Sequence, residues 1–123
     1  MLSLLYFTGM NNTLKNLSEK DSQSLKYFSK RLKQSLPNQV AKLRLYGSKA
    51  RGEAHRYSDT DVLIVLKCAS QRNKNRVYDA KAETVQKYGA VLSAHIMSQK
   101  EYAYEKKLPS LFMQFIEREA IDF

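Results

Sequence analysis

The sequence predicts an α/β domain of the α+β kind, in which a mixed β-sheet is flanked by helices. Apolar residues recur at helical spacing in some segments and form short continuous runs in others, and Pro37, Gly47 and Gly89 separate the two kinds of segment. The 123 residues suffice for one hydrophobic core. We therefore expect one domain over residues 18–123, preceded by an extension at residues 1–17 in which Met10 is a possible natural start.

The first third of the chain predicts a helix followed by a strand. Ser18 is a favoured N-cap, and Pro37 ends the helical pattern. The apolar residues at helical spacing between them are Leu25, Phe28, Leu32 and Leu36. A strand is expected over Val40–Tyr46, with Leu43 and Leu45 on one face, and Gly47 breaks it.

The rest of the chain continues this alternation of helices and strands. A continuous apolar run ends the segment 59–66, as expected for a strand buried on both faces. Ser98 and Glu101 have the spacing of a capping box, and Pro109 suits the start of a last helix. The remaining expected elements are a helical turn at 48–53, a polar loop at 54–58, a polar helix at 72–87 ending near Gly89, and a third strand at 90–97.

Composition limits the classes of function without choosing among them. Lys and Arg number 21 against 12 Asp and Glu, and the net charge of +9 attracts nucleotides, nucleic acid or an acidic protein face. Cys68 is the only cysteine, which excludes an intrachain disulfide and suits the cytoplasm; we expect it to be a small buried hydrophobe. The sequence contains no run of roughly 18 consecutive apolar residues, so it predicts no membrane-spanning helix.

Two acids enter the apolar strand together. Asp59 and Asp61 are two positions apart, so both side chains are expected on one face of the strand. Adjacent carboxylates repel each other unless a cation lies between them, and their oxygen atoms favour Mg²⁺ or Mn²⁺. The alternative, that both are ordinary polar residues at the end of a loop, explains the buried run that follows less well.

A predicted phosphate-binding turn lies just before these acids. Gly47 allows close approach of the backbone, and the helix start after it presents free N–H groups. Ser48 adds a hydroxyl, and its alternative role is that of an N-cap. Lys49 and Arg51 add positive charge; either can face water, and Arg51 can instead pair with Glu53 or Asp59. Phosphoryl and nucleotidyl transfer need metal-binding acids next to a phosphate-binding turn, and these residues supply both.

These residues carry a resemblance to a known family. The stretch Gly47-Ser48-x-Ala50-Arg51-Gly52, followed by Ser58-Asp59-x-Asp61 entering an apolar strand, resembles the signature of the DNA polymerase β-like nucleotidyltransferase superfamily, and most closely its minimal nucleotidyltransferases. The resemblance implies the small nucleotidyltransferase fold. It also implies transfer of a nucleoside monophosphate from a nucleoside triphosphate, expected to be ATP, to a hydroxyl of a protein or small molecule, with divalent ions held by Asp59 and Asp61.

The resemblance also implies partners. Many members act beside a helical HEPN-type protein, often as the antitoxin of a pair, and a homo-oligomer is the other possibility. Specific binding of nucleic acid is not expected, because no helix-turn-helix, zinc finger or aromatic-studded strand is present in the sequence. Tyr102 and Tyr104 cannot share one helix face, so at least one of them is expected to be exposed.

The sequence departs from the family at its third carboxylate. The strand that should carry this acid contains none, and Ser93 or His95 takes its place. His95 can accept a proton or bind a metal, or simply form a hydrogen bond at the end of the sheet. Three outcomes remain open: an enzyme with a depleted metal site, an enzyme completed by a partner, or a nucleotide-binding or interaction module without catalysis.

Overall fold

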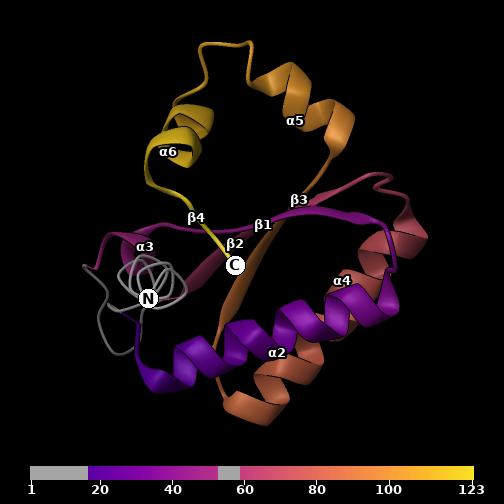
Figure 1. The fold of residues 1–123 in the computed structure, drawn as a ribbon, viewed down its shortest axis with the longest axis vertical. Helices are drawn as coiled ribbons and strands as arrows, with labels where there is room; N and C mark the ends of the chain where they lie inside the picture. Colours follow the sequence, from indigo (N-terminus) through magenta and orange to yellow (C-terminus); the bar gives the residue numbers. More distant parts are fainter. Residues whose placement is uncertain (1–16, 53–58) are drawn as a thin grey trace, which may run out of the picture.

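The computed structural model describes residues 17–52 and 59–123, which form one sheet with helices on both faces (Figure 1). The elements are, in chain order, α2 (Glu19–Ser35), β1 (Val40–Tyr46), α3 (Ser48–Arg51), β2 (Thr60–Leu66), α4 (Gln71–Tyr88), β3 (Leu92–Ser98), α5 (Gln99–Glu105), α6 (Leu111–Glu119) and β4 (Ile121–Asp122). The expected polar loop at 54–58 and nearly all of the expected extension at 1–17 lie outside the described residues. The division of the chain at residue 18 stays a prediction.

The sheet is mixed, as the sequence predicts. Its strands lie in the order β3-β2-β1-β4, in which β1 pairs antiparallel with β2 and β4, while β2 pairs parallel with β3. The residues of the apolar run in β2 are fully buried, because helices cover this strand on both faces. The fold class is therefore confirmed, as a small α/β sandwich around a mixed sheet.

Each face of the sheet packs against its own pair of helices. On one face, the buried leucines of β1 and alternate residues of β2 pack against α2 and α4, which lie side by side in Figure 1. On the other face, Leu63 and Val65 of β2 pack against Tyr102 of α5 and against Met113 and Ile116 of α6. Because side chains alternate along a strand, Asp61 belongs to this second face, together with Leu63 and Val65.

Serine side chains begin the helices. Ser18, Ser70 and Ser98 each accept a hydrogen bond from the third backbone N–H of their helix, and Ser98 and Glu101 form the expected capping box. The expected start of the last helix at Pro109 is wrong. Ser110 is the N-cap, its side chain accepting from the backbone of Met113, and the helix begins at Leu111. A capping hydroxyl satisfies a free N–H, which Pro109 cannot do.

Two further expectations are corrected. A fourth strand, β4, follows the last helix and pairs with Arg44 and Leu45 of β1; two residues are too few to show an alternating pattern in the sequence. Cys68 is exposed rather than buried, because β2 ends at Leu66 and Cys68 lies in the connection to α4, where its carbonyl accepts from Asn73 Nδ2 at 2.8 Å.

Two other features concern the surface. Tyr102 is 5% exposed and Tyr104 is 65% exposed, so the expected separation of these two tyrosines is found. In the described part of the chain, no helix has the length and apolar character required to cross a membrane.

Candidate functional site

The turn at Gly47 brings β1 up against β2. Gly47 has φ 82° and ψ −160°, a backbone conformation that is essentially restricted to glycine. A Cβ atom at this position would overlap Asp61 Oδ2 and would lie 3.3 Å from Asp61 Cγ. The Asp61 carboxylate therefore lies directly against the glycine turn, which is the contact that the predicted site requires.

Ser48 is the first residue of α3 and is half-buried. Gly47 occupies the N-cap position, and the turn carries no side-chain cap. The alternative that Ser48 serves as an N-cap is therefore not what the structure contains. Ser48 directly follows Gly47, the residue that contacts Asp61. The role of the Ser48 hydroxyl group in phosphate binding stays a prediction.

The two acids influence each other across the start of β2. Asp61 pairs with Tyr46 of β1, and Asp59 is exposed immediately before the strand. Burial raises the pKa of Asp61, and the charge of Asp59 raises that pKa further, while Arg51 and Lys49 lower it. The acids are thus close enough to repel each other, and two cations lie near enough to reduce that repulsion.

Lys49 does not face solvent. It is 5% exposed, and its Nζ lies 2.7 Å from Oδ2 of Asp21 in α2. The pair joins the helical turn α3 to the helix on the far face of the sheet. The structure therefore favours an anchoring role for Lys49, and direct binding of a nucleotide by this ammonium stays a prediction.

Arg51 reaches the helices of the second face. Its NH1 lies 3.3 Å from Glu119 Oε2, near the end of α6. Of the two expected partners, Glu53 lies outside the described residues, and Asp59 contributes to the same group of charges around Asp61. Pairing with Glu119 leaves Arg51 exposed at the edge of the site, where phosphate binding stays a prediction.

Ser93 stands beside Asp61. The two residues are in register on the parallel strands β2 and β3, so their side chains share one face of the sheet. Ser93 is exposed, and the position next to the paired acids therefore holds a hydroxyl group instead of a carboxylate. In residues 17–52 and 59–123, no three His, Cys, Asp or Glu side chains come together to hold a metal ion.

His95 is held by an aromatic contact. It is in register with Leu63, one step further along the same face, and its ring stacks on Phe112 at 4.8 Å with 29° between the planes. Phe112 also contacts Tyr46 edge-on at 5.5 Å. His95 thus belongs to a row of three rings on the face that carries Asp61, an arrangement that favours a packing role over metal binding.

Three residues near this site were not predicted from the sequence. Tyr46 faces Asp61, Phe112 braces His95, and Glu119 pairs with Arg51. Only Tyr46 has a signal in the sequence, because it is the last residue before the glycine turn and lies on the face opposite to Leu45. Burial raises its pKa, and the charge of Asp61 raises it further, so the phenol stays protonated at neutral pH.

The residues of the site fit a divalent ion. Mg²⁺ is commonly held by one or two carboxylates together with phosphate oxygens, and Asp59 and Asp61 supply two carboxylates. The raised pKa of Asp61 reflects burial and like charge, and a bound cation would offset both. The fit depends on phosphate oxygens for the other ligands, because the neighbouring strand offers only Ser93.

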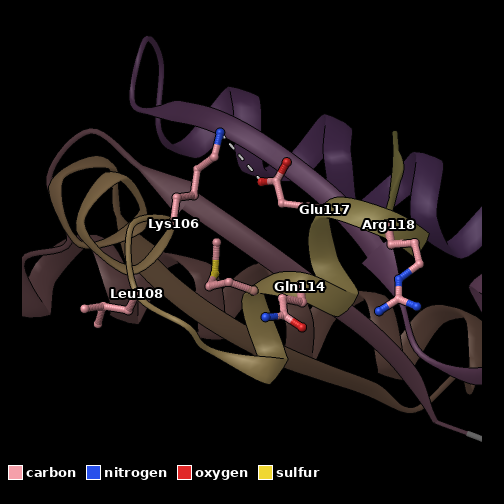
Figure 2. A pocket seen from close by; sticks show the side chains of 6 residues that line it. Lys106, Leu108, Gln114, Glu117 and Arg118 are labelled. Atoms are coloured by element: carbon pink, nitrogen blue, oxygen red, sulfur yellow. Dashed lines mark ion pairs between the residues drawn. The ribbon is translucent and has the colours of Figure 1, made fainter.

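A separate hollow of about 390 Å³ lies beside α6 (Figure 2). It is lined by Lys106, Leu108, Met113, Gln114, Glu117 and Arg118. Lys106 and Glu117 form an ion pair at 3.7 Å across it. None of the predicted site residues lines this hollow, so it is distinct from the candidate site.

A mixed sheet in which Asp61 packs against a glycine turn, with a second acid nearby, suits a domain that acts on phosphorylated ligands. Residues 25–122 match the family model of the nucleotidyltransferase domain, and the chain belongs to this family. The resemblance to the small nucleotidyltransferases is thereby confirmed, and membership supports nucleotidyl transfer as the general activity.

One solved structure supports the fold, and a second shows a lesser degree of structural agreement. A crystal structure of a toxin-antitoxin with AMP-PNP is 13% identical, with a TM-score of 0.56 over 79% of this chain and 69% of that chain. A crystal structure of a protein described as a nucleotidyltransferase from Sulfolobus solfataricus is 18% identical, with a TM-score of 0.49 over 95% of this chain and 84% of that one. A search of the curated proteins finds no match.

Proposed function

We propose that this chain transfers a nucleoside monophosphate from a nucleoside triphosphate, with ATP the expected donor, to a hydroxyl group of a protein or small molecule. The reaction is expected in the cytoplasm, where both substrates are present. One observation carries the proposal: the Asp61 carboxylate lies against Gly47, which supports a single site made of the two acids and the glycine turn. An acid with no role at this position would have no reason to pack against a glycine whose backbone conformation is restricted to glycine.

The proposed reaction balances simply. The acceptor oxygen forms a bond to the α-phosphorus, the bond between that phosphorus and the oxygen leading to the β-phosphate breaks, and pyrophosphate leaves. Magnesium held by Asp59 and Asp61 would supply charge neutralisation on the phosphates. The backbone N–H groups after Gly47 and the hydroxyl of Ser48 would hold the triphosphate, and Arg51 would add positive charge at the rim.

The acceptor proton is the unfilled role. Ser93 occupies the position beside Asp61, and a neutral serine is a poor proton acceptor. His95 is exposed and stacks on Phe112, a contact that favours a packing role. With His95 in that role, the proton would pass to solvent or to a group that a partner supplies, and we expect slow transfer by the isolated chain.

A protein partner is part of this proposal. The similar fold solved with AMP-PNP is a toxin-antitoxin, and we propose that this chain also works as one half of a pair, with a HEPN-type helical protein as the expected other half. Exposed apolar side chains on and between α5 and α6 suit such a contact: Tyr104, Leu108, Leu111 and Phe115 are between 43% and 71% exposed.

The activity is tested by label transfer. The chain is incubated with Mg²⁺ and each α-labelled nucleoside triphosphate, alone and with the product of the neighbouring gene, and labelled acceptor and pyrophosphate are measured. Replacing both Asp59 and Asp61 by Asn should abolish transfer. Asp79→Asn is the matched control, because Asp79 is an exposed acid on α4, on the far side of the sheet. Transfer that survives the double replacement would remove the acids from the mechanism.

The second candidate is a nucleotide-binding or interaction module without catalysis. The serine beside Asp61, in place of an acid, favours it. It predicts formation of a stable complex without nucleotide and no release of pyrophosphate in the presence of the partner. Co-purification followed by a pyrophosphate assay separates the two candidates, because only the enzyme yields pyrophosphate that depends on both acids.

A further inference from the structure

Positive charge is concentrated on the helical layer far from the acid pair. Helices α2 and α4 together contain ten Lys and Arg against four Asp and Glu. Residues 99–122, which cover the other face, contain four cations against five acids. Two of the four acids on α2 and α4 are already in ion pairs, Glu83 with Arg31 and Asp21 with Lys49. The binding of one nucleotide on the opposite face does not account for this excess.

Three of the cations form a stripe along α2. Lys26, Lys30 and Lys33 are spaced four and three residues apart, so they lie on one side of the helix. All three are exposed, and they point away from the buried residues Leu25, Phe28 and Leu32. The stripe spans about 10 Å at the helical rise of about 1.5 Å per residue.

An arginine-lined hollow lies where the C-terminal end of α2 meets the start of α4. Helices α2 and α4 run antiparallel, since Tyr27 meets Tyr88 and Arg76 NH1 donates to the carbonyl oxygen of Ser35 at 3.0 Å. A hollow of about 310 Å³ lies at this end of α2, lined among others by Arg72, Asn73 and Arg76. Its described lining contains no acid. We call Lys26, Lys30, Lys33, Arg72 and Arg76 the basic strip.

The basic strip does not have the composition of a protein interface. The centres of protein interfaces are rich in aromatic residues and poor in lysine. Among the described residues, the large exposed hydrophobics lie on or between α5 and α6, on α4 and at the start of β3, and none lies on α2. Exposed lysines about one helical turn apart, with an exposed arginine on the neighbouring helix, instead suit contacts to phosphates.

We propose that the basic strip binds a nucleic-acid strand through its phosphodiester backbone. Phosphate contacts carry no sequence information, so such binding agrees with the absence of a sequence-reading motif. The strand would lie on the layer opposite to Asp59 and Asp61, which makes this surface separate from the proposed nucleotide site. The inference stands whether or not the chain proves to be an active transferase.

The test uses the full chain and two labelled probes, a short oligouridine and a short oligothymidine, by fluorescence anisotropy. Lys33→Gln with Arg72→Gln removes two cations of the basic strip. Lys100→Gln with Lys107→Gln is the matched control, because it removes two exposed cations from the other layer. All four side chains are exposed, so both variants should fold, which thermal melting verifies.

We expect the unmodified chain to bind at low salt, with affinity falling steeply between about 50 and 200 mM salt. The strip variant should weaken binding about tenfold, and its salt dependence should be shallower by about 0.7 per lost contact. The control should change both quantities far less. A preference between the two probes would identify RNA or DNA as the natural strand.

Two results would overturn the proposal. Equal weakening by both variants would show that net charge alone attracts the probe. Failure to bind either oligonucleotide at low salt, with binding of polyglutamate instead, would assign the strip to an acidic protein.

Discussion

The two sides of the candidate site differ in the charged groups that they contain. On the side of β1, α3 and β2, the glycine turn, Asp61 and two nearby cations lie within one compact arrangement. On the side of β3, the corresponding face carries Ser93 and a histidine stacked on Phe112. Under the proposed function, the first side would hold the nucleotide and the cation, whereas activation of the acceptor would be reduced or supplied by another molecule.

Among the changes that test this contrast between the two sides, the largest effect is expected at the glycine turn. Gly47→Ala forces a side chain into a backbone conformation that costs about 1–3 kcal/mol and into the space of Asp61 Oδ2. Displacing that carboxylate should reduce transfer by about 100-fold, since small misplacements in a reacting complex have effects of this size. Steady-state kinetics with ATP and Mg²⁺ measure it.

Gly89→Ala is the control for that change. Gly89 also has a positive φ, 67°, but it ends α4 and only the flexible end of Lys20 is near, at 3.5 Å. It should cost about 1 kcal/mol of stability and leave transfer unchanged. Equal losses of activity in the two variants would mean that backbone strain, and not the position of Asp61, explains the result.

The next effect sharpens the contrast between the two sides. Ser93→Asp places a carboxylate in register with Asp61, where it can bind the metal and accept the acceptor proton. We expect at least about a tenfold gain in transfer, the lower part of what a positioned base contributes. Ser93→Asn, which has the same size without the charge, should give no gain. A gain from both would point to size alone.

A smaller effect is expected at His95. Its stacking on Phe112 predicts that His95→Ala costs about 0.5–1.5 kcal/mol of stability, while His95→Phe keeps most of it. Both variants should keep the transfer rate and its pH profile if the ring only packs. Denaturant unfolding and a pH–rate profile measure the two consequences. Loss of the low-pH limb from the profile in both variants would instead make His95 the proton acceptor, because a base is inactive when protonated.

The smallest effect concerns pH. Burial and Asp59 raise the pKa of Asp61 above its ordinary value of 3.8, so the folded state holds this proton more tightly than the unfolded chain does. Stability without metal should therefore fall as pH rises from that ordinary value through the raised pKa, and level off above it. Asp61→Asn should remove this slope and stabilise the metal-free protein at pH 7 by about 1 kcal/mol or less, because the site is partly solvated. Melting in EDTA across pH tests it; an unchanged slope would contradict it.

The elements of the fold were predictable where local signals agree. Ser18 and Ser98 cap their helices as expected, and the apolar run of β2 is buried on both faces, because capping and periodicity are local properties. The strand β4 and the exposure of Cys68 were missed. The strand β4 forms because the chain returns to the free edge of β1, and Cys68 is exposed because β2 ends at Leu66. Neither feature leaves a local pattern in the sequence.

The site was predictable only as far as its motif extends. Gly47 and Asp61 carry a spacing that implies their contact, and the structure brings them together. The pairings of Lys49 with Asp21 and of Arg51 with Glu119 join residues 28 and 68 positions apart. Such pairings follow from the packing of α3 against distant helices, and the sequence offers no means of choosing among several acids.

The ion pair between Lys49 and Asp21 spans the interior of the protein, from the turn at the nucleotide side to the helix that bears the basic strip. Separating a buried pair leaves an uncompensated charge, so a movement of α2 is costly unless α3 follows it. Under the two proposals, a nucleotide on one face and a nucleic-acid strand on the other would be connected through this ion pair. If a bound strand changes the affinity for a nucleotide by some factor, reciprocity requires the nucleotide to change the affinity for the strand by the same factor.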